Sequence, residues 1–120
     1  MRQQETPPMP AAPLLSVDEI ASRLTALPTW RLTDGRLTRT VTTRDFRSAL
    51  ELVMRIADPA DEQNHHPDVA IHWNVLALTL WTHASGGITE RDFRLAESIE
   101  PILTGSLPRS SSTVNEKPGE

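Results

Sequence analysis

Cysteine and tyrosine are both missing from this chain of 120 residues. Without thiols, the chain can form neither disulfides nor thiolate zinc sites. Few side chains other than histidine can then exchange protons near neutral pH, where an unperturbed imidazole, with a pKa of about 6.5, is well placed. All four histidines lie between positions 65 and 83. Their clustering within so short a span predicts a functional site.

Long apolar runs are also missing. No segment approaches the roughly 20 apolar residues that span a bilayer, and no continuous apolar stretch near the start indicates a signal peptide. The net charge is −4, and the basic residues are scattered rather than gathered into a stripe. We therefore expect a cytoplasmic protein that binds neither membrane nor nucleic acid.

The two ends of the chain differ from its middle in composition. Residues 1–13 are rich in proline and poor in large apolar side chains, and residues 106–120 are mostly small and polar. Neither end could bury enough apolar surface to offset the entropy lost on ordering, so we expect two disordered tails. One domain remains, over residues 14–105. Because so small a core buries a modest share of its surface, oligomerisation is a reasonable expectation.

Three segments carry helix signals. A capping box at positions 16–19 precedes a helix predicted over residues 17–27. A second helix is predicted to begin after positions 42–45, where apolar residues recur at helical spacing, and Pro59 is expected to end or kink it. A second capping box, at positions 89–92, begins the last helix.

Between the helix signals, apolar and polar residues alternate in the manner of strands. The segments concerned are 30–32, 36–41, 69–73 and 76–81. Asp34 and Gly35 suit the tight turn of the first hairpin. The resulting order, α-β-β-α-β-β-α, predicts an α+β domain with a four-stranded antiparallel sheet and helices packed on one face.

The histidines belong to a wider pattern of polar residues. Asp61 precedes the run His65-His66-Pro67 by four positions. An aromatic-Asn pair, a Thr-His pair, a Gly-Gly turn and an Arg-Asp pair follow; they are Trp73-Asn74, Thr82-His83, Gly86-Gly87 and Arg91-Asp92. At these separations the set resembles the pterin-4a-carbinolamine dehydratase family. The resemblance runs from about residue 16 to about residue 103 and includes Trp30.

This resemblance implies an assembly and a reaction. Family members assemble as dimers and tetramers, so a homodimer or homotetramer is expected. Their reaction dehydrates 4a-hydroxytetrahydropterin to quinonoid dihydropterin. It needs a general acid for the leaving hydroxyl and a base for the N5 proton. Positioned histidines can serve both steps without metal or organic cofactor, and the implied substrate is a pterin.

The resemblance also implies roles for individual residues. His65 and His83 are candidates for proton transfer to the leaving hydroxyl, and His66 for ligand binding or for the base. The expected substrate-binding or orienting residues are Asp61, Trp73, Asp92, Arg91 and Trp30. Either aspartate could fix an imidazole tautomer, and Asp92, at the third position after the Thr89 cap, is also the expected acidic residue of the last helix's capping box.

Three other interpretations stay open at this level. A histidine pair on its own is often part of a surface loop. Three histidines and an aspartate could ligate a metal, although the helical His-Glu-x-x-His pattern is absent and adjacent histidines rarely bind one ion. Members of the family also act as binding partners that stabilise the oligomers of other proteins. A non-catalytic assembly or protein-binding factor is therefore the alternative to an enzyme.

Overall fold

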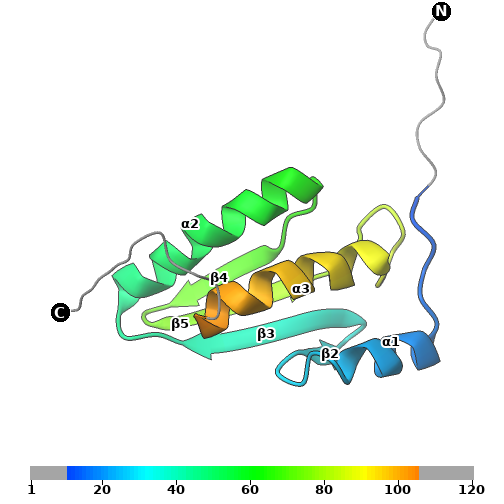
Figure 1. The fold of residues 1–120 in the computed structure, drawn as a ribbon, viewed down its shortest axis with the longest axis horizontal. Helices are drawn as coiled ribbons and strands as arrows, with labels where there is room; N and C mark the ends of the chain where they lie inside the picture. Colours follow the sequence, from blue (N-terminus) through cyan, green and yellow to red (C-terminus); the bar gives the residue numbers. More distant parts are fainter. Residues whose placement is uncertain (1–10, 106–120) are drawn as a thin grey trace, which may run out of the picture.

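The computed structural model describes residues 11–105, which form three helices and four strands, and the strands make one sheet (Figure 1). In chain order the elements are α1 (Val17–Leu24), β2 (Arg31–Thr33), β3 (Arg36–Thr42), α2 (Phe46–Gln63), β4 (Asp68–His72), β5 (Val75–Leu80) and α3 (Glu90–Thr104). The predicted order and the α+β class are confirmed. The tails expected at residues 1–13 and 106–120 lie outside the described residues, apart from positions 11–13.

The sheet has the strand order β2-β3-β5-β4, and every neighbouring pair is antiparallel. The β2–β3 hairpin turns at Asp34 and Gly35, whose φ angles of 52° and 75° are of the sign that a tight two-residue turn needs. The central β3–β5 pairing sets Leu37 opposite Leu80 and joins this hairpin to the one formed by β4 and β5. Two local hairpins thus meet through one long-range pairing.

The core lies between the sheet and the helices. Leu76, Leu78 and Leu80 alternate along β5, so all three face the same side and are buried. They belong to the same apolar cluster as Phe93 and Ile99 of α3. Full burial of one such side chain contributes about 1.5–3 kcal/mol. This layer therefore fixes α3 on the sheet, and with it the position of the α3 start.

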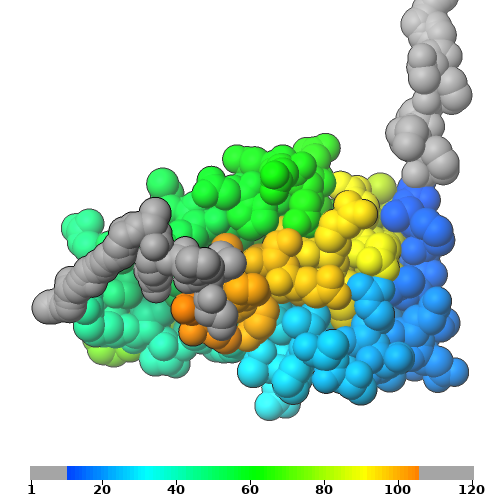
Figure 2. Space-filling view, in the orientation of Figure 1, coloured from blue at the N-terminus to red at the C-terminus, as the bar shows by residue number. Residues whose placement is uncertain are grey.

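All three helices contribute to that one core. Ile20 of α1, Ile56 of α2 and Ile99 of α3 are buried in the same cluster. The ribbon shows α2 and α3 on one face of the sheet (Figure 1), and the space-filling view shows α3 between α2, in green, and the α1–β2 region, in blue and cyan (Figure 2). None of the helices between residues 11 and 105 combines the length and apolarity needed to cross a membrane.

The first helix is shorter than predicted. It ends at Leu24 rather than near residue 27. The backbone N–H groups of residues 25–27 donate to carbonyls only three positions earlier, which makes tight turns instead of a further helical turn. Capping by Ser16 and Glu19 at the start is as predicted.

The sequence predicts that Pro59 ends or kinks α2. Pro59 does not end the helix, because α2 continues to Gln63. Proline removes one backbone hydrogen bond from a helix interior. The turn that follows offsets this loss, because it buries Ala60 and because Gln63 donates to the Ser98 hydroxyl of α3 at 2.9 Å. Helix α3 likewise runs past its own proline, Pro101. The extra turn of α2 is what brings its C-terminal end to the candidate site.

Candidate functional site

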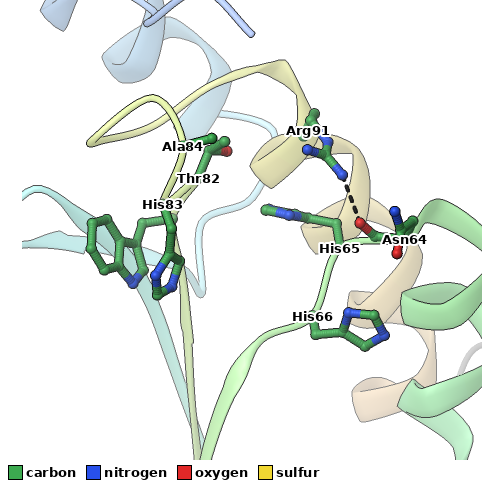
Figure 3. A pocket seen from close by; sticks show the side chains of 8 residues that line it. Asn64, His65, His66, Thr82, His83, Ala84 and Arg91 are labelled. Atoms are coloured by element: carbon green, nitrogen blue, oxygen red, sulfur yellow. Dashed lines mark hydrogen bonds between the residues drawn. The ribbon is translucent and has the colours of Figure 1, made fainter. Parts of the chain in front are cut away.

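Three segments meet around a pocket: the end of α2, the segment after β5 and the start of α3. The pocket is open and has a volume of about 360 Å³ (Figure 3); its walls are Asn64, His65, His66, Trp81, Thr82, His83, Ala84 and Arg91. Pockets of a few hundred Å³ hold small organic ligands. The structure thus brings the three histidines singled out in the sequence to one place, while His72 lies elsewhere, exposed on β4.

Asn64 provides the chain reversal that precedes the two adjacent histidines. It ends α2 in the left-handed conformation, with φ 51° and ψ 45°, which asparagine tolerates better than most residues. The backbone N–H of His65 then donates to the Ala60 carbonyl at 3.0 Å. His65 is buried and His66 is exposed. Arg91 stabilises the reversal, since its Nη2 donates to the Asn64 carbonyl at 2.6 Å (Figure 3).

His65 lies against a fully buried carboxylate. Its Nε2 is 2.6 Å from Oδ1 of Asp92, whose side chain has no exposed surface. The other oxygen of Asp92 accepts from the backbone N–H of Thr89 at 2.9 Å and from the hydroxyl of Thr82 at 2.8 Å. Asp92 therefore completes the capping box of α3 and contacts His65 at the same time.

His66 meets a different carboxylate, at the surface. Its Nε2 is 2.9 Å from Oδ1 of Asp61, and the side chains are 56% and 77% exposed. Pairs this exposed contribute about 0–1 kcal/mol, so the contact orients the ring but holds it only loosely. Asp61 can reach His66 because α2 continues past Pro59.

His83 lies across the pocket from His65 and His66 (Figure 3). Its ring centroid is 3.9 Å from that of Trp81, with 33° between the ring planes. The guanidinium of Arg36 covers the Trp81 ring at 4.2 Å from its centroid, a cation–π contact. The Trp81 ring thus contacts both a cation and the imidazole, and it limits the positions that the His83 ring can take.

Two residues predicted to contact substrate lie away from the pocket. Trp30 is 3% exposed, and its Nε1 donates to Glu100 of α3 at 2.7 Å. Trp73 occupies the β4–β5 turn with a φ of 54°, and 70% of its surface is exposed. Neither is among the residues that line the pocket. In a single chain, therefore, the tryptophan at the pocket wall is Trp81.

Trp81 and Thr82 are the contributors that the sequence prediction missed. The alternation along β5 indicates only that Trp81 faces away from the leucines. Its place two residues before His83 is the signal that could have found it, because such residues share a side of a strand. In the sequence Thr82 stands out only as the neighbour of His83. Its contact with Asp92, ten positions later, has no local signal.

The site offers proton-transfer groups around one pocket. Three imidazoles line it, and two of them have a carboxylate of their own. Across residues 11–105, no group of three histidine, aspartate or glutamate side chains is arranged to hold a metal ion. Imidazole is a common general acid and base in proteins, so the arrangement suits acid–base chemistry.

Comparisons with known proteins agree on one family. The family described as Pterin 4 alpha carbinolamine dehydratase matches residues 13–102. A Mycolicibacterium smegmatis protein named "Putative pterin-4-alpha-carbinolamine dehydratase" is 42% identical over 91 residues, which are 76% of this chain and 97% of the relative. An Acidobacterium capsulatum protein of the same name is 44% identical over 89 residues, 74% of this chain and 97% of the relative.

A solved structure gives the same result at the level of the fold. The crystal structure of a transcriptional coactivator/pterin dehydratase from Brucella melitensis matches with a TM-score of 0.72 and 30% sequence identity. The match covers 76% of this chain and 99% of the Brucella chain. The matches therefore span nearly the whole length of the relatives, and the residues outside the matches are residues of this chain.

Proposed function

Because the chain belongs to the pterin-4-alpha-carbinolamine dehydratase family, we propose that it dehydrates a 4a-hydroxytetrahydropterin to the quinonoid dihydropterin. The observation that carries the proposal is the convergence of His65, His66 and His83 on one pocket. The volume of that pocket, about 360 Å³, suits a bicyclic ring.

The proposed reaction removes water across the C4a–N5 bond of the pterin. The C4a–O bond breaks, and the hydroxyl leaves as water once it has received a proton. N5 loses its proton, and the electron pair of the N–H bond forms the C4a=N5 double bond. One group must therefore give a proton and another must take one, without any oxidant or reductant. Each such acid–base contribution typically accelerates a reaction by about 10²–10⁴-fold.

The positions of the histidines support a division of the work. His65 and His83 form facing walls, so a flat ring between them would meet an imidazole on either side (Figure 3). We assign proton exchange at the leaving hydroxyl to these two residues. His66, exposed beside Asp61, is assigned to ligand binding or to the base.

Dehydration of freshly generated 4a-hydroxytetrahydropterin, followed by absorbance, tests the proposal. We expect clear acceleration by the purified protein and loss of most of it in the double variant His65→Ala, His66→Ala. His72→Ala is the matched control, since His72 is exposed on β4 and lies outside the pocket. A folded double variant that is as fast as the wild type would exclude both residues from the mechanism.

The second candidate function is a protein-binding factor. The observation in its favour is the similarity to the Brucella protein, a transcriptional coactivator/pterin dehydratase. Calorimetric titration with an unreactive tetrahydropterin separates the two, because an enzyme must bind the ring. A well-folded chain that neither binds the pterin nor accelerates its dehydration would put the binding factor first.

A further inference from the structure

A chain of buried hydrogen bonds runs from the start of α3 to His65. The hydroxyls of Thr89 and Thr82 are 2.7 Å apart, and the Thr82 hydroxyl is 2.8 Å from Oδ2 of Asp92. Oδ1 of Asp92 is 2.6 Å from Nε2 of His65. All four residues are buried, with exposed fractions of 8% for His65, 2% for Thr82 and 0% for the other two.

The protons along this chain have only one consistent order. An ionised carboxylate only accepts, so Thr82 gives its single hydroxyl proton to Asp92. Thr82 can then only accept from Thr89, whose own oxygen accepts from the backbone N–H of Arg91 at 3.2 Å. At the far end, Nε2 of His65 must be the donor to Asp92. Among the described residues, Nδ1 of His65 has no partner.

From this order we propose that Thr82 is a positioning residue which, with Thr89, holds Asp92 so that His65 keeps its proton on Nε2. Nδ1 is then the atom through which His65 exchanges protons with a ligand. The inference deepens the proposed function and rests on it for its link to catalysis. The tautomer itself is a property of the protein alone and can be tested without substrate.

Nuclear magnetic resonance of the ring nitrogens in ¹⁵N-histidine-labelled full chain is the first test. We expect His65 to show a protonated Nε2 and an unprotonated Nδ1 at mildly alkaline pH. In Asp92→Asn, the two donors at the Oδ2 position, Thr82 and the Thr89 N–H, should keep the amide oxygen there. The amide NH₂ would then face His65 and move the proton to Nδ1. A wild-type His65 protonated on Nδ1 would overturn the proposal.

Kinetics of Thr82→Val form the second test, since valine keeps the shape and removes the hydroxyl. We expect a roughly three- to tenfold lower kcat with little change in KM, the size of effect of one hydrogen bond. The Nδ1-protonated form of His65 should also become detectable. Thr82→Ser should restore both properties. Thr79→Val makes the same chemical change three residues earlier, within β5 and outside the pocket, and should leave both unchanged.

The two tests separate this inference from the proposed function. If the tautomers behave as expected but no variant or wild-type protein dehydrates the pterin, the positioning role stands and the proposed reaction falls. If Thr82→Val matches the wild type in both tautomer and kcat, the positioning role falls and the reaction stands. Should Thr82→Val fail to fold, Thr82→Ala, which also removes the hydroxyl, takes its place with the same expected outcomes.

Discussion

Trp81 has an unusual chemical environment for a residue at a pocket wall. Its Nε1 is buried and has no hydrogen-bond partner among the described residues, while its ring contacts His83 and Arg36. An unsatisfied buried donor costs about 1–3 kcal/mol. The contacts of the ring with His83 and Arg36 are therefore present despite this cost, and these contacts depend on the aromatic ring rather than on its N–H.

Replacing Trp81 with phenylalanine should show which part of the side chain is needed. Trp81→Phe keeps a ring beside His83 and removes the unpaired N–H, so we expect the free energy of unfolding to stay the same or to rise by up to about 1 kcal/mol. Trp81→Leu, which removes the aromatic face, should lower both stability and dehydration rate. Urea denaturation and the absorbance assay measure these effects. A loss of more than about 1 kcal/mol in Trp81→Phe would contradict this expectation, and would mean that the packing of the larger indole ring or a partner of its N–H stabilises the fold.

At the residue scale, the sequence predicted the titratable groups of the site better than its aromatic ones. His65, His66 and His83 carry a motif with fixed spacing, and the structure places all three at one pocket. Trp30 and Trp73 also match the spacing of the family motif, but they do not line the pocket. An aromatic side chain serves a core, a turn or a ligand equally well, so spacing alone does not locate it. Asp92 can be assigned to the site only from two facts together: its position at the start of α3, which the sequence shows, and its contact with His65, which only the structure shows.

At the scale of elements, Glu100 joins three parts of the fold. Its carboxylate accepts from Nε1 of Trp30 at 2.7 Å, from Arg39 of β3 at 3.0 and 3.1 Å, and from the Thr29 hydroxyl at 3.1 Å. Burial alone would raise the pKa of Glu100, but the hydrogen bonds from Arg39 and Trp30 outweigh burial and hold this pKa below its ordinary value. The carboxylate thus ties α3 to the sheet and to the α1–β2 connection.

Because the folded pKa of Glu100 is lowered, its contribution to stability is present above the ordinary glutamate pKa of about 4.3 and is lost as the pH falls through the folded value. We expect Glu100→Gln to lower the unfolding free energy at pH 7 by roughly 1.5–3 kcal/mol, the range for hydrogen bonds to charged groups. The difference from the wild type should shrink below about pH 4. Urea denaturation at several pH values measures it.

Glu97→Gln is the matched control for that experiment. Glu97 lies on the same helix, but its side chain is 53% exposed and, within residues 11–105, it pairs only with Arg23, at 3.2 Å. An exposed pair contributes about 0–1 kcal/mol. Equal effects of the two substitutions at pH 7 would contradict a special role for Glu100 in joining the elements.

The elements themselves were largely predictable, and their ends were not. Capping boxes, the helical spacing of apolar residues, alternation and the Asp34-Gly35 turn are local signals, and between residues 11 and 105 they located every helix and strand. Pro59 misled because its cost is local whereas the compensation is tertiary: Ala60 is buried in the core and Gln63 bonds to α3. The position of a helix end depends on both the local cost and the tertiary compensation, and only the local cost can be read from the sequence.

At the scale of the whole molecule, one side of α2 leaves an apolar stripe uncovered. Phe46, Leu50 and Met54 follow one another at intervals of four and are 49%, 42% and 73% exposed. Residues at this spacing lie on one helix face, and grouped exposed apolar side chains mark interaction surfaces. We infer that this stripe takes part in the homodimer or homotetramer expected for the chain.

Met54→Glu tests this inference, because a charge in a buried interface is costly whereas the exposed site in a monomer tolerates it. We expect sedimentation velocity to show an oligomer for the wild type and a smaller species for the variant. Ala21→Glu adds the same charge to an exposed position of α1 and should leave the assembly unchanged. A Met54→Glu protein that sediments like the wild type would exclude the stripe from the interface.

Asp92 serves two purposes with one side chain, since it caps α3 and contacts His65. A lineage that abandoned the chemistry would still be selected to keep an acid at this position, because the helix start needs one. Retention of the aspartate in a descendant would then say little about whether the activity survives. His65 and Thr82 cap no helix, so their replacement would be the informative sign of lost chemistry.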